Sequence, residues 1–261
     1  TMYKNPSSSP LLEIEGLSKN FGALYAIDHL DLHLDSDGIT GLIGPNGAGK
    51  TTVFNTVTGI HKPTSGRVLY RGLDITAWPA HRVANLGVAR TFQNLKIFKR
   101  LTVLDNILGA QTSLPRMASW LGKFRGKAAD KTATDAAEHA LVMVGLADRQ
   151  GSLAQELPLG EQRRLELARA LAREPDLLML DEPAGGMTPQ ETEDMAQLIE
   201  KIASSGPSVL LIEHKMSLVM SLCQNIIVLN FGQKIAEGDP GVVQSDPAVR
   251  EAYLGSERDH A

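Results

Sequence analysis

The sequence contains only one cysteine, Cys223, among its 261 residues. A single thiol cannot form a disulfide within the chain, so a disulfide-held fold is excluded and a reducing compartment is favoured. Cys223 lies in an apolar stretch with no potential catalytic partner beside it in the sequence. We therefore expect a buried structural thiol there and not a nucleophile.

Long hydrophobic runs are also missing from the sequence. No apolar stretch approaches the roughly 20 residues that a membrane-spanning helix requires, and no signal-peptide pattern opens the chain. Residues 1–10 are rich in serine and proline, and we expect them to form a disordered leader. Any role at a membrane would then depend on a partner that spans it.

Aromatic residues and basic charge are scarce. Aromatic residues make up 5% of the chain and the formal net charge is -4, whereas hydrophobic residues reach 43%. This composition predicts a sizeable core that is built mainly from aliphatic side chains. Proteins that bind nucleic acids are usually basic, so the charge argues against nucleic acid as a partner.

Apolar strands alternate with helical patterns over most of the chain, which predicts an α/β fold with a mostly parallel, helix-covered sheet. Residues 94–156 differ, because their apolar residues repeat only with helical spacing, and we expect a helical insertion there. Residues 11–93 and 157–238 would form the α/β core, and residues 239–261 a C-terminal tail. The expected core elements are strands at 11–17, 30–34, 39–43, 177–180 and 209–212, hairpins at 63–75 and 226–236, and helices at 51–59, 160–175 and 188–205.

A glycine-rich motif follows the strand expected at 39–43. It fits the P-loop pattern G-x-x-x-x-G-K-[ST] and lies between a strand and a helix, which is the context that this motif requires. Glycines let backbone N–H groups approach phosphate, Lys50 adds a full charge for the β- and γ-phosphates, and the Thr51 hydroxyl suits Mg²⁺. The flanking elements argue against the alternative, a glycine-rich turn without function. The expected residues for binding ATP are Gly44, Pro45, Asn46, Gly47, Ala48, Gly49, Lys50, Thr51 and Thr52.

Polar side chains follow three other strand-like runs. Asp181 has the position of a partner for Mg²⁺, and Glu182 that of a general base for the attacking water. Gln93 and His214 end two further runs, and strand ends in such a fold point at the phosphates. Gln93 is therefore a candidate for the metal and the water, and His214 for the γ-phosphate. Either residue in isolation is more often a satisfied surface or core group.

Together these motifs resemble the nucleotide-binding subunits of ABC transporters. The P-loop, Gln93, the segment LPLGEQRRLELARAL, LLMLDEP and His214 occur in the order and spacing of that family, over about the whole chain after residue 10. The resemblance is closest to the subunits of branched-chain amino acid importers, on the segments GVARTFQNLKIFKRLTVLDNILGAQ, DEPAGGMTP and DPAVREAYLG. It implies a P-loop NTPase core with an antiparallel β subdomain and an inserted helical subdomain.

The resemblance also implies roles for individual residues. Gln93 would link the metal site to the membrane subunits, Glu182 would be the catalytic glutamate, and His214 the switch histidine. Phe21 would stack on the adenine ring, for which an aromatic face is chemically suited. The alternative for Phe21 is a core residue beside Gly22.

The signature motif of the family usually reads Leu-Ser-Gly-Gly-Gln, whereas residues 157–161 read LPLGE. In the family this motif contacts ATP bound to a second subunit, so Leu157, Gly160 and Glu161 are expected to act in trans. Pro158 lacks the hydroxyl and the backbone donor of serine, and Glu161 would repel a γ-phosphate. We therefore expect a weakened half-site, which would matter at one of the two sites of a heterodimer. Thr188 also departs from the family, and we expect it to cap the helix that follows.

These features predict a Mg²⁺-dependent ATPase that drives uptake of branched-chain or related amino acids. The expected partners are permease subunits, a second ATP-binding subunit (identical or different) and, indirectly, a substrate-binding protein. The chain would lie on the cytoplasmic face of the inner membrane. The alternatives are an exporter ATPase, such as one for lipopolysaccharide, a soluble ABC ATPase without a transport role, and an inactive regulatory cassette. The permease would dock on residues 94–108, with Leu95, Ile97, Phe98 and Leu101 exposed.

Overall fold

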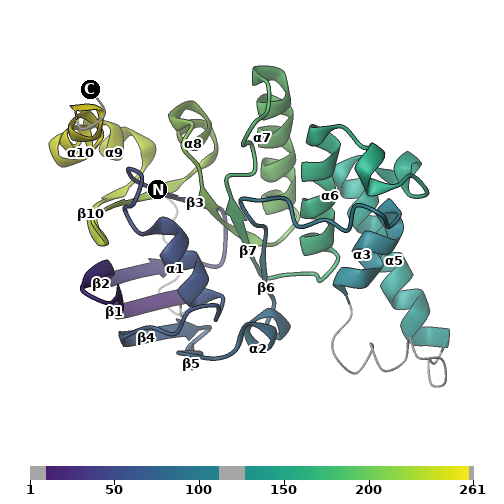
Figure 1. Cartoon of the computed structure of the whole chain (residues 1–261), viewed down its shortest axis with the longest axis horizontal. Coiled ribbons are helices and arrows are strands. Elements are labelled where there is room, and N and C mark those ends of the chain that lie inside the picture. Colours follow the sequence, from purple (N-terminus) through teal and green to yellow (C-terminus); the bar gives the residue numbers. More distant parts are fainter. Residues whose placement is uncertain (1–9, 112–126, 259–261) are drawn as a thin grey trace, which may run out of the picture.

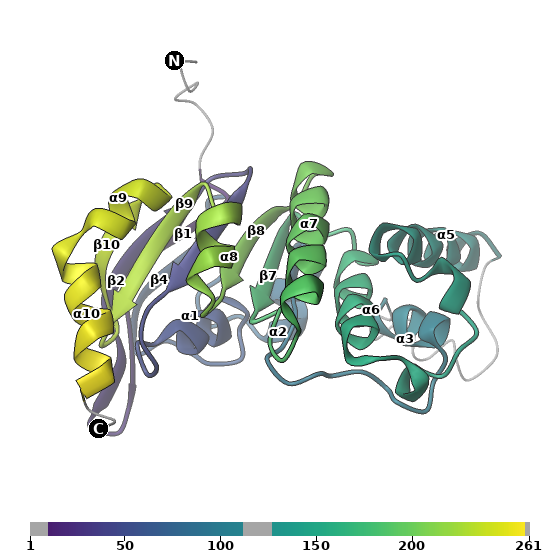
Figure 2. The same cartoon turned by 90° about the horizontal axis from the view of Figure 1, so that it is seen from above.

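The computed structural model describes residues 10–111 and 127–258 (Figures 1 and 2). The leader expected at residues 1–10 falls, apart from Pro10, outside this part of the chain. The strands are β1 (Leu12–Phe21), β2 (Leu24–Leu34), β3 (Ile39–Ile43), β4 (Ser65–Tyr70), β5 (Leu73–Asp74), β6 (Val88–Arg90), β7 (Leu177–Asp181), β8 (Ser208–Ile212), β9 (Asn225–Asn230) and β10 (Gln233–Gly238). The helices are α1 (Lys50–Val57), α2 (Ala80–Asn85), α3 (Val103–Ala110), α5 (Lys127–Val144), α6 (Leu159–Leu171), α7 (Pro189–Ser204), α8 (Met216–Leu222), α9 (Pro240–Ser245) and α10 (Pro247–Arg258), with short 3-10 turns η1 (Ala147–Arg149) and η2 (Ala154–Glu156).

A six-stranded sheet forms the centre of the molecule, in the order β10-β9-β3-β8-β7-β6. Strands β9, β3, β8, β7 and β6 run parallel, and β10 pairs with β9 in the antiparallel direction at one edge. Every residue of β7 and β8 is buried, which is typical of parallel strands that are covered on both faces. The predicted parallel sheet and the predicted closing hairpin are therefore confirmed.

Alternate residues of the central sheet face two separate cores. Leu178 and Leu180 of β7 pack in a core that includes α7 and α8, whereas Met179 packs in a second core with α1 and the antiparallel sheet. Strand β3 is divided in the same way, with Ile43 in the first core and Leu42 in the second. The loop that follows β3 therefore starts from a strand that is fixed on both faces.

A second, four-stranded sheet is antiparallel and has the order β2-β1-β4-β5. In β2, the buried residues Leu30, Leu32 and Leu34 alternate with exposed ones, which is the predicted pattern of period two. The hairpin of β4 and β5 lies at one edge, as the sequence predicted for residues 63–75. The predicted antiparallel β subdomain is confirmed.

Helix α7 begins where its capping signal predicts. Thr188 is the N-cap, because its hydroxyl accepts the backbone N–H of Glu191 and its own N–H donates to the Glu191 carboxylate at 2.9 Å. Pro189 occupies the first turn. The expected capping role of Thr188 is confirmed, and it gives the departure from the family at this position a local structural reason.

Helices α3, α5 and α6 pack together at one end of the molecule, and α9 and α10 lie at the opposite end (Figures 1 and 2). The predicted insertion at 94–156 contains α3 and α5, and α6 follows it in the sequence and packs against both. The predicted boundary at residue 156 stays a prediction. Among the described residues, no helix is both long and apolar enough to cross a membrane.

The residues that were expected to form a C-terminal tail contain two helices, α9 and α10. These helices start at Asp239-Pro240 and Asp246-Pro247, and both aspartates accept backbone N–H groups of the turn that follows. Aspartate before proline is a helix-start signal, so the sequence held the information that would have predicted these helices.

Cys223 follows α8 and is 5% exposed. Burial raises the pKa of its thiol to about 12, so the reactive thiolate is almost absent at neutral pH. The expected structural role of Cys223 is confirmed.

Candidate nucleotide-binding site

The glycine-rich loop joins β3 to α1, and its glycines stand where side chains would collide with backbone. A Cβ atom on Gly44 would lie 2.0 Å from the Leu229 carbonyl oxygen, and one on Gly49 would lie 2.3 Å from that of Ala26. Gly47 also has a positive φ of 80°, but nothing lies within 4 Å of its Cβ position. The loop is therefore packed tightly at both ends and open in the middle.

Lys50 places its charge inside this loop. Its ammonium group donates to the carbonyl oxygens of Gly44 at 2.7 Å and Pro45 at 2.9 Å, and the residue is only 6% exposed. Burial lowers the pKa of Lys50, while Glu182 and Asp181 act in the opposite direction. A partly desolvated cation at a helix N-terminus is suited to binding phosphate.

Asp181 ends β7 and is 1% exposed. Its Oδ2 atom pairs with Nη2 of Arg90 at 2.8 Å, and its backbone N–H donates to the Thr91 hydroxyl at 3.2 Å. Its Oδ1 atom is buried and has no hydrogen-bond partner within the described part of the protein. A buried carboxylate oxygen without a partner is costly, so this atom fits a metal ion or a metal-bound water.

Glu182, Gln93 and His214 meet at one atom. Oε1 of Glu182 accepts from Nε2 of Gln93 at 3.1 Å and lies 2.9 Å from Nε2 of His214. Glu182 has a positive φ of 50°, which is uncommon for a residue other than glycine. The structure thus brings together three residues that the sequence predicted from separate strand ends.

Glu213 is a part of the site that the sequence analysis missed. It is 3% exposed, and its carboxylate accepts backbone N–H groups of Ala184 at 3.0 Å and His214 at 3.1 Å. It therefore joins the loop after Glu182 to the loop that carries His214. Its position between a buried strand and His214 was the only signal of this role in the sequence.

Phe21 lies at the end of β1 and is 48% exposed. The ammonium group of Lys19 lies 4.9 Å from the centroid of its ring, and the His61 ring contacts it edge-on at 5.4 Å. The alternative that Phe21 is a core residue is wrong, because half of its surface faces solvent. An exposed ring is compatible with the predicted stacking on adenine, which stays a prediction.

The predicted signature motif lies at the start of α6. Leu157 is buried, Pro158 is the N-cap residue, and Glu161 is in the first turn. Oε2 of Glu161 lies 3.5 Å from Nε of Arg149, an ion pair that partly neutralises the glutamate. Helix α6 lies apart from α1 in both views, so the chain does not bring this motif to its own P-loop (Figures 1 and 2).

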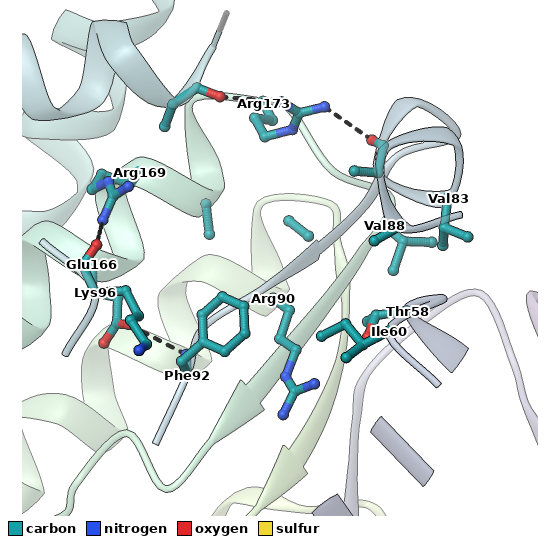
Figure 3. Close-up of a pocket in the computed structure, with 15 residues that line it drawn as sticks. Thr58, Ile60, Val83, Val88, Arg90, Phe92, Lys96, Glu166, Arg169 and Arg173 are labelled. Atoms are coloured by element: carbon teal, nitrogen blue, oxygen red, sulfur yellow. Dashed lines mark hydrogen bonds between the residues drawn. The ribbon is translucent and has the colours of Figure 1, made fainter. Parts of the chain in front are cut away.

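A cavity of about 260 Å³ opens between α2, β6, the residues after β6 and α6 (Figure 3). Its cationic lining residues are Arg90, Lys96, Arg169 and Arg173, and its acidic one is Glu166. Burial raises the pKa of Glu166, and the backbone N–H of Phe92 and the charge of Arg163 oppose this shift. The cavity is thus basic, with apolar walls.

The predicted docking residues follow Phe92 in the sequence, which lines this cavity, and they differ in exposure. Phe98 is 52% exposed and Leu101 is 41% exposed, whereas Leu95 and Ile97 are half-buried and Ile97 packs against the core. The fully buried side chain of Asn106 holds this segment, because it bonds both the N–H and the carbonyl of Phe98. Exposure of Phe98 and Leu101 is therefore confirmed, and exposure of the other two holds only in part.

Comparisons with known proteins agree with this geometry. Residues 27–185 match the family model for ABC transporters, and residues 233–259 match one described as branched-chain amino acid ATP-binding cassette transporter. The high-affinity branched-chain amino acid transport ATP-binding protein BraF of Pseudomonas aeruginosa is 43% identical over 95% of this chain and 99% of BraF. The lipopolysaccharide export system ATP-binding protein LptB of Haemophilus influenzae is 31% identical over 95% of this chain and 98% of LptB. The ADP conformation of an ATP-binding cassette from an ABC transporter has a TM-score of 0.83 and 30% identity, over 95% of this chain and 99% of that one.

The fold and the site define an ATP-binding cassette with ATPase activity. The chain belongs to the ABC transporter family. The predicted resemblance to the branched-chain amino acid group is confirmed as well, because the match to BraF is higher in identity than the match to LptB.

The P-loop geometry predicts different costs for two alanine substitutions. Gly47→Ala should lower the free energy of unfolding by about 1–2 kcal/mol, the cost of a left-handed backbone at a residue with a Cβ atom. Gly44→Ala should cost a further ~1–3 kcal/mol, because its Cβ would overlap the Leu229 carbonyl. Urea unfolding of both variants measures the difference, and equal losses would contradict this packing.

Proposed function

We propose that the chain hydrolyses ATP as the ATP-binding subunit of an importer for branched-chain or related amino acids. The observation that carries the catalytic part is the meeting of Gln93, Glu182 and His214 at one carboxylate oxygen, beside a P-loop that holds Lys50. The observation that carries the transport part is the similarity to BraF over nearly the whole chain.

The P-loop would bind the phosphates of ATP. Its backbone N–H groups from Asn46 to Thr52 would surround the β-phosphate, and Lys50 would exchange its carbonyl partners for phosphate oxygens. The middle of the loop at Gly47 has the open space that such an approach requires. Phe21 would support the adenine ring from the end of β1.

Thr51, Asp181 and Gln93 are the residues that would hold Mg²⁺ with the phosphates. Asp181 fits because its buried Oδ1 atom lacks a partner among the residues described, and Thr51 is exposed at the start of α1. No group of three or more His, Cys, Asp and Glu side chains in the described ranges is arranged as a metal site. Phosphate oxygens and water would complete the shell, as is usual for Mg²⁺ bound with a nucleotide. The ion would neutralise charge on the transferred phosphoryl group.

Glu182 would act as the general base for the attacking water. Its Oε1 atom has a hydrogen-bond donor in Gln93, and Nε2 of His214 lies 2.9 Å from the same atom. The two neighbours follow β6 and β8 and hold the carboxylate after β7, where a water could lie between it and the γ-phosphate. His214 would also contact the γ-phosphate once ATP is bound.

The signature residues Leu157, Gly160 and Glu161 would complete the site of a second subunit. Their distance from the P-loop helix of the same chain supports this arrangement in trans (Figures 1 and 2). The second subunit would be a related ATP-binding chain, so that two subunits enclose two ATP molecules.

The basic cavity of Figure 3 and the exposed Phe98 together support a docking surface for the permease subunits. The chain would then lie at the cytoplasmic face of the inner membrane and meet a substrate-binding protein only through the permease. Lipopolysaccharide export is the second candidate, and the 31% identity to LptB favours it less than the 43% identity to BraF favours amino-acid import.

Glu182→Gln should retain ATP binding and lose hydrolysis, because glutamine keeps the size of the side chain but is not a base. Phosphate release should fall by about 10²–10⁴-fold, and the protein mass with and without ATP should show an ATP-held dimer. The control is Glu200→Gln on the exposed surface of α7. Equal phosphate release by both variants, alone or in the assembled transporter, would refute the role of Glu182.

The altered signature predicts a gain from substitution. The double variant Pro158→Ser with Glu161→Gln should raise the ATPase rate of the assembled transporter about two- to fivefold, because it removes a like-charge repulsion of about 1 kcal/mol or less between Glu161 and the phosphate that this helix N-terminus would face. Glu138→Gln on α5 is the control. An unchanged rate would refute the weakened half-site.

Phe98→Asp should prevent copurification of the chain with its permease subunits, since it places a charge on the exposed apolar surface. Leu73→Asp on β5 is the matched control, with 45% exposure against 52% for Phe98. Nucleotide binding by the isolated chain should be unchanged in both variants. Retention of the permease by Phe98→Asp would exclude this surface.

A further inference from the structure

We propose that Arg90 is a positioning residue for the Asp181 carboxylate, and that the Phe92 ring holds Arg90 in place. This inference rests on the proposed nucleotide site and names a residue of it to which the motifs of the sequence analysis gave no role. Its experimental consequence is that Arg90 controls how strongly Mg²⁺ improves nucleotide binding.

Arg90 is the last residue of β6, and its side chain is 7% exposed. Nη2 pairs with Oδ2 of Asp181 at 2.8 Å, and Nη1 donates to Oδ1 of Asn55 at 2.6 Å. The guanidinium lies over two aromatic rings, 5.3 Å from the centroid of Phe54 and 5.1 Å from that of Phe92. One side chain therefore connects the end of β7, helix α1 and the segment that carries Gln93.

Stability alone does not explain this arrangement. Removing two charges from water costs several kcal/mol per ion, and a buried ion pair regains this only with excellent geometry. What this arginine supplies is orientation, because its planar guanidinium is anchored by Asn55 and therefore holds Nη2 in a fixed place against Oδ2 of Asp181. A carboxylate with only one neutral neighbour would be freer to rotate and exchange its two oxygens.

The orientation selects the oxygen that is left free. With Oδ2 held by Arg90 and the Asp181 backbone N–H held by Thr91, the buried Oδ1 atom is the one without a partner in the ranges described. Groups that fix a metal-binding carboxylate commonly contribute 10–100-fold, in approximate terms, to metal affinity. Arg90 thus prepares Oδ1 before the metal arrives.

Phe92 extends this contact to the surface. Arg90 and Phe92 both line the cavity of Figure 3, where their side chains lie next to each other on one wall. The backbone N–H of Phe92 donates to the buried Glu166 of α6 at 3.2 Å, which anchors the backbone that carries the ring. A change at Phe92 should therefore loosen the guanidinium and, through it, the Asp181 carboxylate.

The test uses the full chain and the ATP analogue AMP-PNP, whose dissociation constant is measured by titration calorimetry in EDTA and in Mg²⁺. The dissociation constant in EDTA divided by that in Mg²⁺ gives the factor by which the metal improves binding. Arg90→Ala should lower this ratio about tenfold or more, and Arg90→Lys and Phe92→Leu should lower it by a smaller factor. Arg67→Ala is the matched control, because Arg67 also pairs with a carboxylate, Glu15 at 2.6 Å, but on the exposed surface.

A ratio that stays at the wild-type value in folded Arg90→Ala or Arg90→Lys would overturn the proposal. An equal loss of affinity in EDTA and in Mg²⁺ would do so as well, because it would show a general structural role. If Arg90→Ala does not fold, the same ratio is measured in Arg90→Lys and in Asn55→Ala. Asn55→Ala removes only the second hydrogen bond of Arg90. Failure of the wild-type chain to bind AMP-PNP would instead refute the proposed nucleotide site itself.

Discussion

The parallel pairing of four neighbouring strands is the constraint on which the proposed site depends. Strands β3, β8, β7 and β6 lie side by side, and their carboxyl ends lead to the P-loop, His214, Glu182 and Gln93. Both faces of these strands are covered by apolar cores, so the strand ends have little freedom to move. Chemistry that requires several groups at one phosphate is therefore built on strands that are buried on both faces, at the edge where ligands bind in open α/β sheets.

The charged side chains at this edge of the sheet are held by a small number of partners. Lys50 is held by carbonyl oxygens, Asp181 is paired through only one oxygen, and Glu182 shares one oxygen with two neutral or weakly basic neighbours. Each group is thus positioned, and Asp181 keeps one buried oxygen without a hydrogen-bond partner among the described residues. Phosphate and a divalent cation would supply the missing partners, which explains why a fold tolerates partly desolvated charges in this place.

The sequence predicted the local parts of this arrangement and missed the long-range ones. The P-loop, the Asp181-Glu182 pair and the Thr188 cap are contiguous motifs in which neighbouring residues determine the geometry. Arg90 lies in an apolar strand and contacts Asp181, 91 positions away, so its partner was not visible in any window of sequence. The helices α9 and α10 differ from these long-range contacts, because their Asp-Pro starts are local signals in the sequence itself. The signature showed a charge at Glu161, but only the fold placed Arg149 beside it.

The central claim is that ATP and Mg²⁺ bind at the carboxyl ends of β3, β6 and β7, with Asp181 oriented by Arg90. A crystal structure of the chain with AMP-PNP and Mg²⁺ tests it most directly. The account predicts phosphates along the loop from Gly44 to Lys50, and a metal beside Thr51 on the Oδ1 side of Asp181, while Arg90 keeps Oδ2. A nucleotide bound elsewhere, or a metal on Oδ2 with Arg90 displaced, would contradict it.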